Sequence, residues 1–126
     1  MSTNRRAWIG ALMLVAACAP AAKNSRALTP SRDVYLTVEN QNWLDASIYV
    51  VHGASQLRIG QVTGNGSAQL RIPSSAIVAG QVRLMADAIG SNERFVTDVI
   101  TVDPDQRLQL TLAPAMRMSS YAIRQR

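Results

Sequence analysis

The central part of the chain alternates between apolar and polar residues. From Asp33 to Ala113, short aliphatic and β-branched runs follow a period of two, and clusters of Gly, Asn, Pro and Ser separate them. Seven such runs predict strands over residues 33–38, 46–52, 56–62, 68–72, 81–87, 95–102 and 107–113. Because no long helical period lies between them, we expect an all-β domain, a seven-stranded antiparallel β-sandwich with a closed barrel as the alternative.

Three local patterns refine this expectation. The last run alternates most cleanly and predicts that Leu108, Leu110 and Leu112 are buried. In the run 95–102, strict alternation would place Asp98 on the apolar face, so we expect a β-bulge near Asp98. Asn65 and Gly66 form a pair typical of a hairpin turn, because both residues tolerate a positive φ.

Charge separates the domain from its flanks. Residues 33–113 contain all eight acids and five arginines, a net charge of −3. The flanks within residues 18–126 carry a net charge of +6, from Lys23, Arg26, Arg32, Arg117, Arg124 and Arg126. We expect residues 114–126 to be a basic C-terminal tail, either disordered or a short helix, because so short a helix is marginal alone. Such a tail could press the domain onto an anionic membrane or could simply be solvated.

The amino terminus has the organisation of a signal peptide. Arg5 and Arg6 precede a charge-free stretch over residues 7–22. A spanning helix needs about 20 apolar residues, and Gly10 and Pro20 interrupt this shorter run. We therefore expect a targeting segment and not a permanent membrane span.

The residues Val15-Ala16-Ala17-Cys18 resemble the lipobox of bacterial lipoproteins, and Cys18 is the single cysteine of the chain. This resemblance implies a signal peptide at residues 1–17, an acylated Cys18 as lipid anchor, and a flexible tether over 18–32. It also implies a place in the cell envelope, with the periplasmic face of the outer membrane favoured because Ala19 is not the aspartate of inner-membrane retention. The alternative is an ordinary signal, with cleavage after Ala19-Pro20-Ala21.

The strand order of residues 33–113 resembles immunoglobulin-like and transthyretin-like sandwich modules. Three segments, Arg58–Val62, Val82–Asp87 and Leu108–Leu112, also look like parts of uncharacterised envelope lipoproteins of high-GC bacteria. The resemblance implies a fold and a location but no activity. Another envelope protein is the expected partner besides the membrane, and a nucleic acid is not expected.

Candidate chemistry is sparse along the chain. One cysteine excludes an internal disulfide, and His52 is the single histidine, which excludes clustered imidazole ligands. Nucleophile-elbow, phosphate-loop and zinc-protease motifs do not occur. We therefore expect a non-catalytic structural or protein-binding module without a cofactor, with a small-ligand module, for sugar or calcium, as the alternative.

Two loops contain the remaining candidate residues. Trp43 and Leu44, in the loop 40–45, could contact a partner because aromatic anchors dominate interface energies. The interpretation that we favour is that Trp43 covers the open end of the core, because a small domain needs its few aromatic residues. Asp103 and Asp105 could offer oxygens to Ca²⁺, but we favour an ordinary Asp-Pro turn, in which the proline sets φ and an aspartate bonds the backbone.

Overall fold

A computed structural model of the protein describes residues 33–125, which form an all-β unit. The predicted signal peptide (1–17), Cys18 and the predicted tether lie outside the described residues. The strands are β1 (Val34–Asn40), β2 (Ala46–His52), β3 (Ser55–Val62), β4 (Ser67–Ile72), β5 (Gln81–Val82), β6 (Leu84–Ala88), β7 (Arg94–Val96), β8 (Ile100–Thr101), β9 (Gln106–Leu112) and β10 (Ser120–Gln125). Two short 3-10 helices, η1 (Ser74–Ala76) and η2 (Met116–Met118), interrupt the loops.

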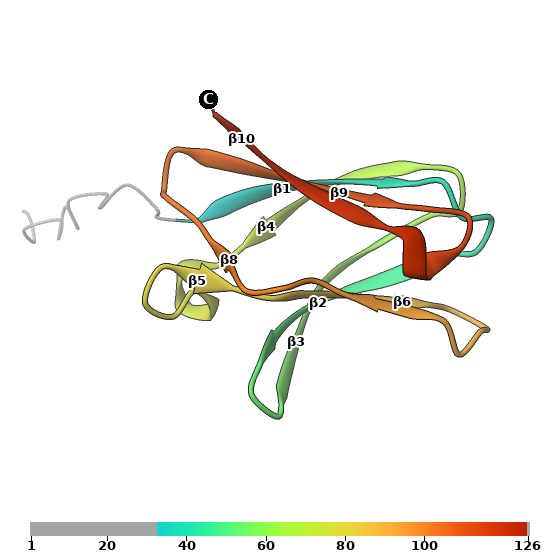
Figure 1. Ribbon diagram of the computed structural model, residues 1–126, viewed down its shortest axis with the longest axis horizontal. Helices are drawn as coiled ribbons and strands as arrows, with labels where there is room; N and C mark the ends of the chain where they lie inside the picture. The colour runs from blue at the N-terminus through green and yellow to red at the C-terminus, as the bar shows by residue number, and fades with distance from the viewer. Residues whose placement is uncertain (1–32, 126) are drawn as a thin grey trace, which may run out of the picture.

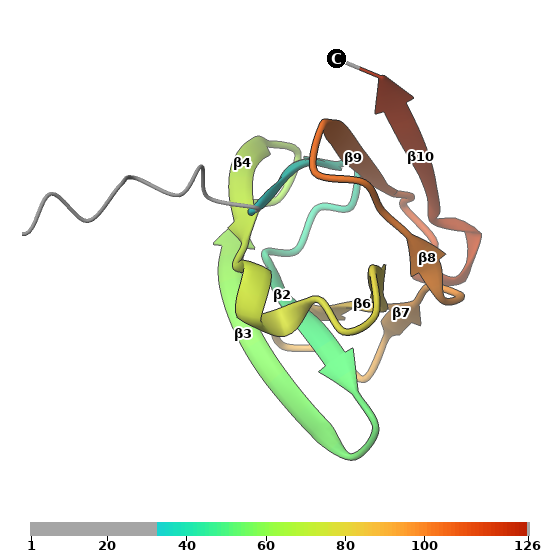
Figure 2. The same cartoon turned by 90° about the vertical axis from the view of Figure 1, so that its left-hand side faces the viewer.

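Two four-stranded sheets face each other across one core (Figures 1 and 2). Sheet I has the order β10-β9-β1-β4, and sheet II has the order β3-β2-β6-β7. Alternate residues of both sheets point inward, as period-two alternation requires. They form a single buried cluster that includes Leu36, Ile48, Ile72, Leu84, Leu108, Leu110 and Leu112. The predicted burial of the three leucines of residues 107–113 is confirmed.

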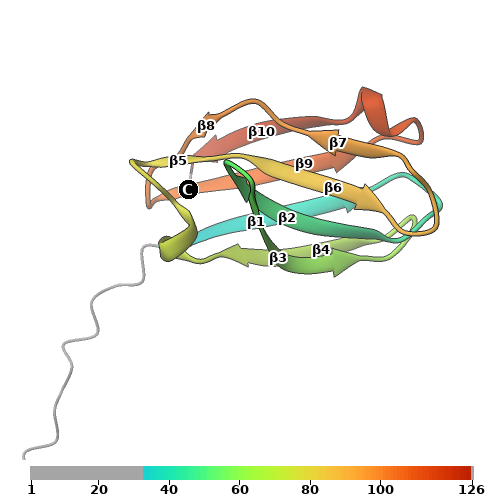
Figure 3. The same cartoon turned by 90° about the horizontal axis from the view of Figure 1, so that it is seen from below.

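The sheets are not purely antiparallel, which corrects the prediction. β1 and β9 lie side by side and run parallel, with Leu36 opposite Leu108 and Val38 opposite Leu110 (Figure 3). Parallel neighbours need a long connection, and β2 to β8 supply it. The alternation within each strand does not specify strand direction, so the sequence pattern could not reveal this pairing.

Two predicted strands each divide in two, and β10 forms from the predicted tail, so the strand count is ten and not seven. The run 81–87 breaks at Arg83 into β5 and β6, and the run 95–102 breaks at residues 97–99 into β7 and β8. β6 pairs with β7 in sheet II, whereas β5 pairs with β8 in a separate two-stranded sheet. The conflict at Asp98 is thus resolved by a break in the strand and not by a bulge, and Asp98 is exposed.

The predicted tail is part of the domain. β10 pairs antiparallel with β9 along its whole length, and Met116 of η2 is buried in the core. The prediction of disorder or a short helix over 115–126 is therefore wrong, and the folded unit extends to Gln125 and does not end at Ala113. The physical reason is that β10 hydrogen-bonds to the backbone N–H and C=O groups along one edge of β9. Without β10, those groups would form an open edge of the sheet.

Candidate interaction surface at the loop end

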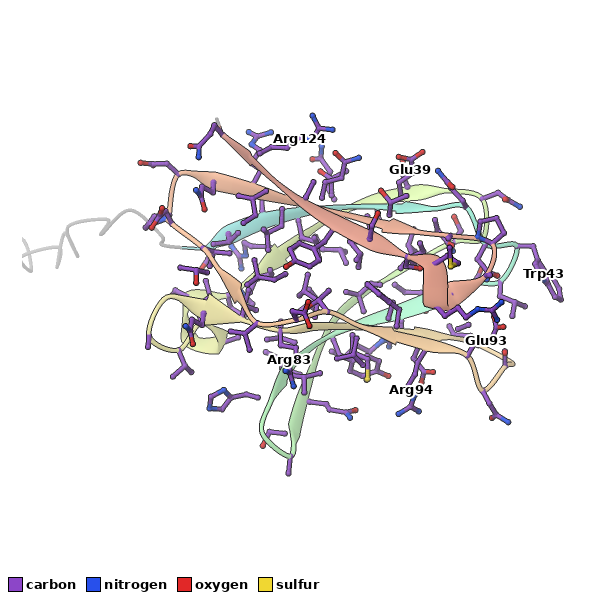
Figure 4. The ribbon with its side chains drawn as sticks, in the orientation of Figure 1. Glu39, Trp43, Arg83, Glu93, Arg94 and Arg124 are labelled. Atoms are coloured by element: carbon purple, nitrogen blue, oxygen red, sulfur yellow. The ribbon has the colours of Figure 1, made fainter. Side chains whose placement is uncertain are left out.

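The strand directions give the domain two ends of different character. One end, which we call the loop end, carries the connections 41–45, 63–66, 89–93 and 113–119. The opposite end, which we call the root end, contains Asp33 at the start of β1, the turn between β8 and β9, and the end of β10 (Figure 1). Trp43 projects outward at the loop end (Figure 4) and is 75% exposed.

Two buried asparagines hold the loop that presents Trp43. Asn40 and Asn42 are 2% and 1% exposed. The Asn40 amide donates to the carbonyls of Leu44 (2.8 Å) and Thr63 (3.1 Å), and its oxygen accepts the Asn42 N–H (2.9 Å). The Asn42 oxygen accepts the Leu44 N–H (2.9 Å), and its amide donates to the Pro114 carbonyl (2.9 Å). Asparagine suits such turns because its side chain hydrogen-bonds nearby backbone groups.

The loop is also fixed against the turn between β3 and β4. The Asp45 carboxylate accepts the Gly64 N–H (2.8 Å), and the Asn42 carbonyl accepts the Asn65 N–H (2.9 Å). A Cβ at Gly64 would lie 2.1 Å from the Trp43 carbonyl oxygen, so only glycine permits this approach. Asn65 has a φ of 55°, and the Gly66 N–H donates to the Thr63 carbonyl (3.1 Å), so the chain does turn here. The predicted hairpin is wrong, however, because β3 lies in sheet II and β4 lies in sheet I, and the turn joins the two sheets.

The structure contradicts the interpretation that Trp43 covers the core. Leu44 takes that place: it is half-buried and packs against the core cluster. Two further large apolar side chains are exposed at the same end, Ile89 (45%) between β6 and β7 and Met118 (70%) in η2. The Ile89 N–H donates to the Asp45 carbonyl (2.8 Å), which joins its loop to that of Trp43.

An exposed indole on a loop whose backbone is fixed is suited to burial against a partner. Because the loop is already ordered, binding costs little backbone entropy, and the aromatic side chain buries a large area. The sequence pattern identified Trp43 but missed Ile89 and Met118, since single apolar residues in loops carry no periodic signal. The two asparagines were also missed, although the spacing Asn40-x-Asn42 is a signal for consecutive side-chain turns.

Asp103 and Asp105 lie at the root end, in the turn between β8 and β9, and both are exposed. The Gln106 N–H donates to the Asp103 carbonyl (3.0 Å), and the Gln106 side chain accepts the Asp103 N–H (3.1 Å). These contacts are those of an Asp-Pro turn with Pro104 at its second position. Within residues 33–125, no group of three His, Cys, Asp or Glu side chains is placed to hold a metal ion.

A shallow cleft of about 330 Å³ lies between the β2–β3 hairpin and β5. The tip of this hairpin projects from the rest of the domain (Figure 2). The floor of the cleft is apolar and includes Val51, Val82 and Val99, and its polar side chains come from His52, Gln81 and Arg83. His52 is exposed at the end of β2.

Comparisons with known proteins add little to this geometry. The chain matches no family model, and a search of curated proteins finds no match. One solved structure similar to it is described as the NMR structure of the protein from Eubacterium rectale. That structure is 14% identical, with a TM-score of 0.48 over 75% of this chain and 91% of the other. In the described part of the chain, no helix has the length and apolar character to cross a membrane.

Proposed function

We propose that the protein is a cell-envelope lipoprotein, anchored through Cys18 in the outer membrane and facing the periplasm. Its immunoglobulin-like sandwich is a non-catalytic module that binds another envelope protein through the loop end. The lipobox Val15-Ala16-Ala17-Cys18 supports the anchor, and the two facing sheets support the sandwich.

The exposure of Trp43 is the observation that carries the binding proposal. Isolated apolar residues on a surface are ordinary, but an indole that is 75% exposed at the tip of a rigid loop is not. The buried Asn40 and Asn42 hold this loop in one conformation. Tryptophan is enriched among the residues that dominate interface energies, so the loop end is the surface best suited to a protein partner.

The binding proposal is tested by photo-crosslinking in intact cells of the native host. A photoreactive side chain in place of Gln41, an exposed neighbour of Trp43 in the same loop, is compared with one in place of Leu57, which is 47% exposed on the projecting hairpin. We expect one discrete crosslinked species from position 41 and none from position 57. That species should disappear when Trp43→Ser is combined with the label at position 41. The same pattern from both positions, or no crosslink from either, would contradict the proposal.

The anchor has a separate test, because it concerns a different part of the chain. Mass spectrometry of the mature protein should find diacylglyceryl-cysteine at position 18 as the first residue. Cys18→Ser should block cleavage by the lipoprotein peptidase. A mature chain that begins unmodified at Ala22 would overturn the lipid anchor and leave the binding proposal standing.

The second candidate function is small-ligand binding, which the cleft beside the β2–β3 hairpin favours. Its lining residues include His52, Gln81 and Arg83 but no carboxylate. Calcium prefers 6–8 oxygen ligands, so a sugar fits this lining better than calcium does. Titration with cell-wall sugars should then shift the amide resonances of Val51 and Val99, and unchanged resonances at millimolar sugar would exclude this function.

A further inference from the structure

A row of three arginines and one tyrosine crosses the outer face of sheet I. The strand registers place Arg71 opposite Tyr35, Tyr35 opposite Arg107, and Arg107 opposite Arg124. Residues opposite each other in a sheet point to the same face, so these four side chains, which we call the basic row, lie together. The row exists because residues 120–125 form β10, which brings Arg124 beside Arg107.

The basic row is exposed and carries excess positive charge. Tyr35 is 54% exposed, and the Arg71 side chain is 64% exposed. The Arg71 guanidinium pairs with Asp33 (3.2 Å), whereas Arg107 and Arg124 form no ion pair with any residue of 33–125. Arg124 donates to the neutral side chain of Gln109. Two positive charges of the row are therefore not neutralised by an acid of the described domain.

Charge changes along sheet I from the root end to the loop end. The next row contains Gln69, Thr37, Gln109 and Ala122, which are uncharged. Glu39 follows in the third row, nearer the loop end, where Figure 4 shows it on the same face as Arg124. Asp33, at the start of β1, pairs with Arg71, and the two aspartates of the turn before Gln106 lie at the same end of the domain.

The basic row lies where the chain enters the domain. Tyr35 is two residues after Asp33, and the fourteen residues 19–32 separate Asp33 from Cys18. For the flexible tether that the sequence predicts there, random-coil scaling gives a mean reach of roughly 20 Å. An anchor at Cys18 therefore holds the root end close to the lipid headgroups. The basic row then meets the headgroups at a higher effective concentration than it would in an unanchored domain.

We propose that the basic row docks the domain on anionic phospholipid headgroups, with the root end of sheet I against the membrane and the loop end directed away from it. The proposal rests on the lipid anchor of the proposed function. Arginine forms paired hydrogen bonds to phosphate, and an exposed tyrosine suits an interface that is apolar on one side and wet on the other. The contact is screened over about 8 Å at physiological salt, so it depends on ionic strength.

The opposite face supplies a matched control. Sheet II also carries outward arginines, but they do not form a row of one sign. Arg94 faces Asp87 across β6 and β7, and the Arg58 side chain donates to Gln61 (2.8 Å). Figure 4 shows Arg94 and Arg124 on opposite sides of the molecule. Replacing Arg58 and Arg94 removes the same charge as replacing Arg107 and Arg124, from the other face.

The test uses the mature protein from its native membrane, placed in nanodiscs whose headgroups carry a gadolinium chelate. On discs rich in phosphatidylglycerol, we expect strong relaxation of the amides of β1, β9 and β10 near the basic row. Phosphatidylcholine discs or high salt should weaken it, because the anchor alone keeps the domain near the headgroups without fixing its orientation. R107Q/R124Q should lower the ratio of docked to free domain about fivefold for each charge removed, whereas R58Q/R94Q should leave the ratio unchanged.

Each contrary result has a distinct meaning. Equal relaxation of both sheets in the anchored protein, or equal relaxation on neutral and anionic discs, overturns the docking and leaves the anchor intact. A decrease in the ratio of docked to free domain that is the same for R107Q/R124Q and for R58Q/R94Q also overturns the docking. Since the lipid and salt comparisons use the unaltered chain, they decide the matter even if a variant misfolds. A protein that carries no lipid on Cys18 would not enter the discs, and that failure overturns the anchor.

Discussion

Single polar side chains complete the backbone hydrogen bonding of this small domain where its strands end or break. Asn42 is the clearest example, because its oxygen accepts the Leu44 N–H and its amide donates to the Pro114 carbonyl. Asn42→Ala leaves both backbone groups unpaired, and we expect it to lower the free energy of unfolding by about 1–3 kcal/mol. Gln41→Ala, at an exposed neighbour, should change it by less than about 0.5 kcal/mol. Urea unfolding of the two variants measures both effects, and equal midpoints would contradict the role of Asn42.

Thr97 has the same role at the break between β7 and β8. It is 3% exposed, and its hydroxyl accepts the Leu84 N–H (3.0 Å) and donates to the Asp98 carbonyl (2.8 Å). The side chain thus replaces a strand ladder that stops at this residue. Thr97→Val keeps the shape but removes the hydroxyl, and it should lower the free energy of unfolding by about 1–3 kcal/mol. Thr97→Ser keeps the hydroxyl and should cost less, as calorimetric melting of both variants would show. If the serine variant were the less stable one, the hydroxyl would not be the important group.

These side chains also mark the limit of what the sequence predicted. Alternation identified the buried faces of the long strands, because a half-buried strand needs an apolar residue at every second position. The conflict at Asp98 was visible, but alternation could not distinguish a bulge from a strand that passes between sheets. That choice depends on Thr97 reaching the Leu84 N–H, a contact between residues thirteen positions apart.

At the scale of elements, β9 is the strand on which the fold depends most. It pairs with β1 on one side and β10 on the other, and its inward leucines are at most 1% exposed. Leu110→Asp buries an unpaired charge and should prevent folding, at a cost of several kcal/mol. Gln109→Asp, on the outer face beside Arg124, should leave the melting temperature nearly unchanged. Similar melting temperatures for the two variants would contradict the register of β9.

β10 gives a second prediction at this scale. Deleting residues 120–126 removes the strand that pairs with β9. The amides of β9 that hydrogen-bond to β10 should then exchange hydrogen much faster, and the melting temperature should fall. Deleting Arg126 alone is the control, since that residue lies beyond β10. A disordered tail would leave exchange in β9 unchanged.

The sequence did not predict β10 because only Tyr121 and Ile123 alternate with polar or small residues there, a pattern too short to distinguish from a loop.

At the scale of the whole molecule, the fold places two surfaces with different chemistry at different positions along its length. The basic row lies beside the start of β1, and Trp43 lies at the loop end, where β1 finishes. The position of Trp43 in the loop after the first strand follows from the sequence pattern, but the basic row does not, since it depends on the pairing of β1 with β4 and β9 and of β9 with β10. A domain docked by its basic row near the lipid would hold the loop end available to a partner in the periplasm.

The fluorescence of Trp43 tests this arrangement without any variant. The chain has two tryptophans, and Trp8 belongs to the predicted signal peptide, so its removal as proposed would leave Trp43 as the single indole of the mature protein. Because Trp43 is 75% exposed, we expect a red-shifted emission that aqueous iodide quenches strongly. Lipids brominated along their acyl chains should not quench it when the anchored protein sits in anionic vesicles, since the loop end is directed away from the bilayer. Strong quenching by brominated lipid would instead place Trp43 in the membrane, reverse the orientation, and turn the loop end from a protein-binding surface into a second membrane contact.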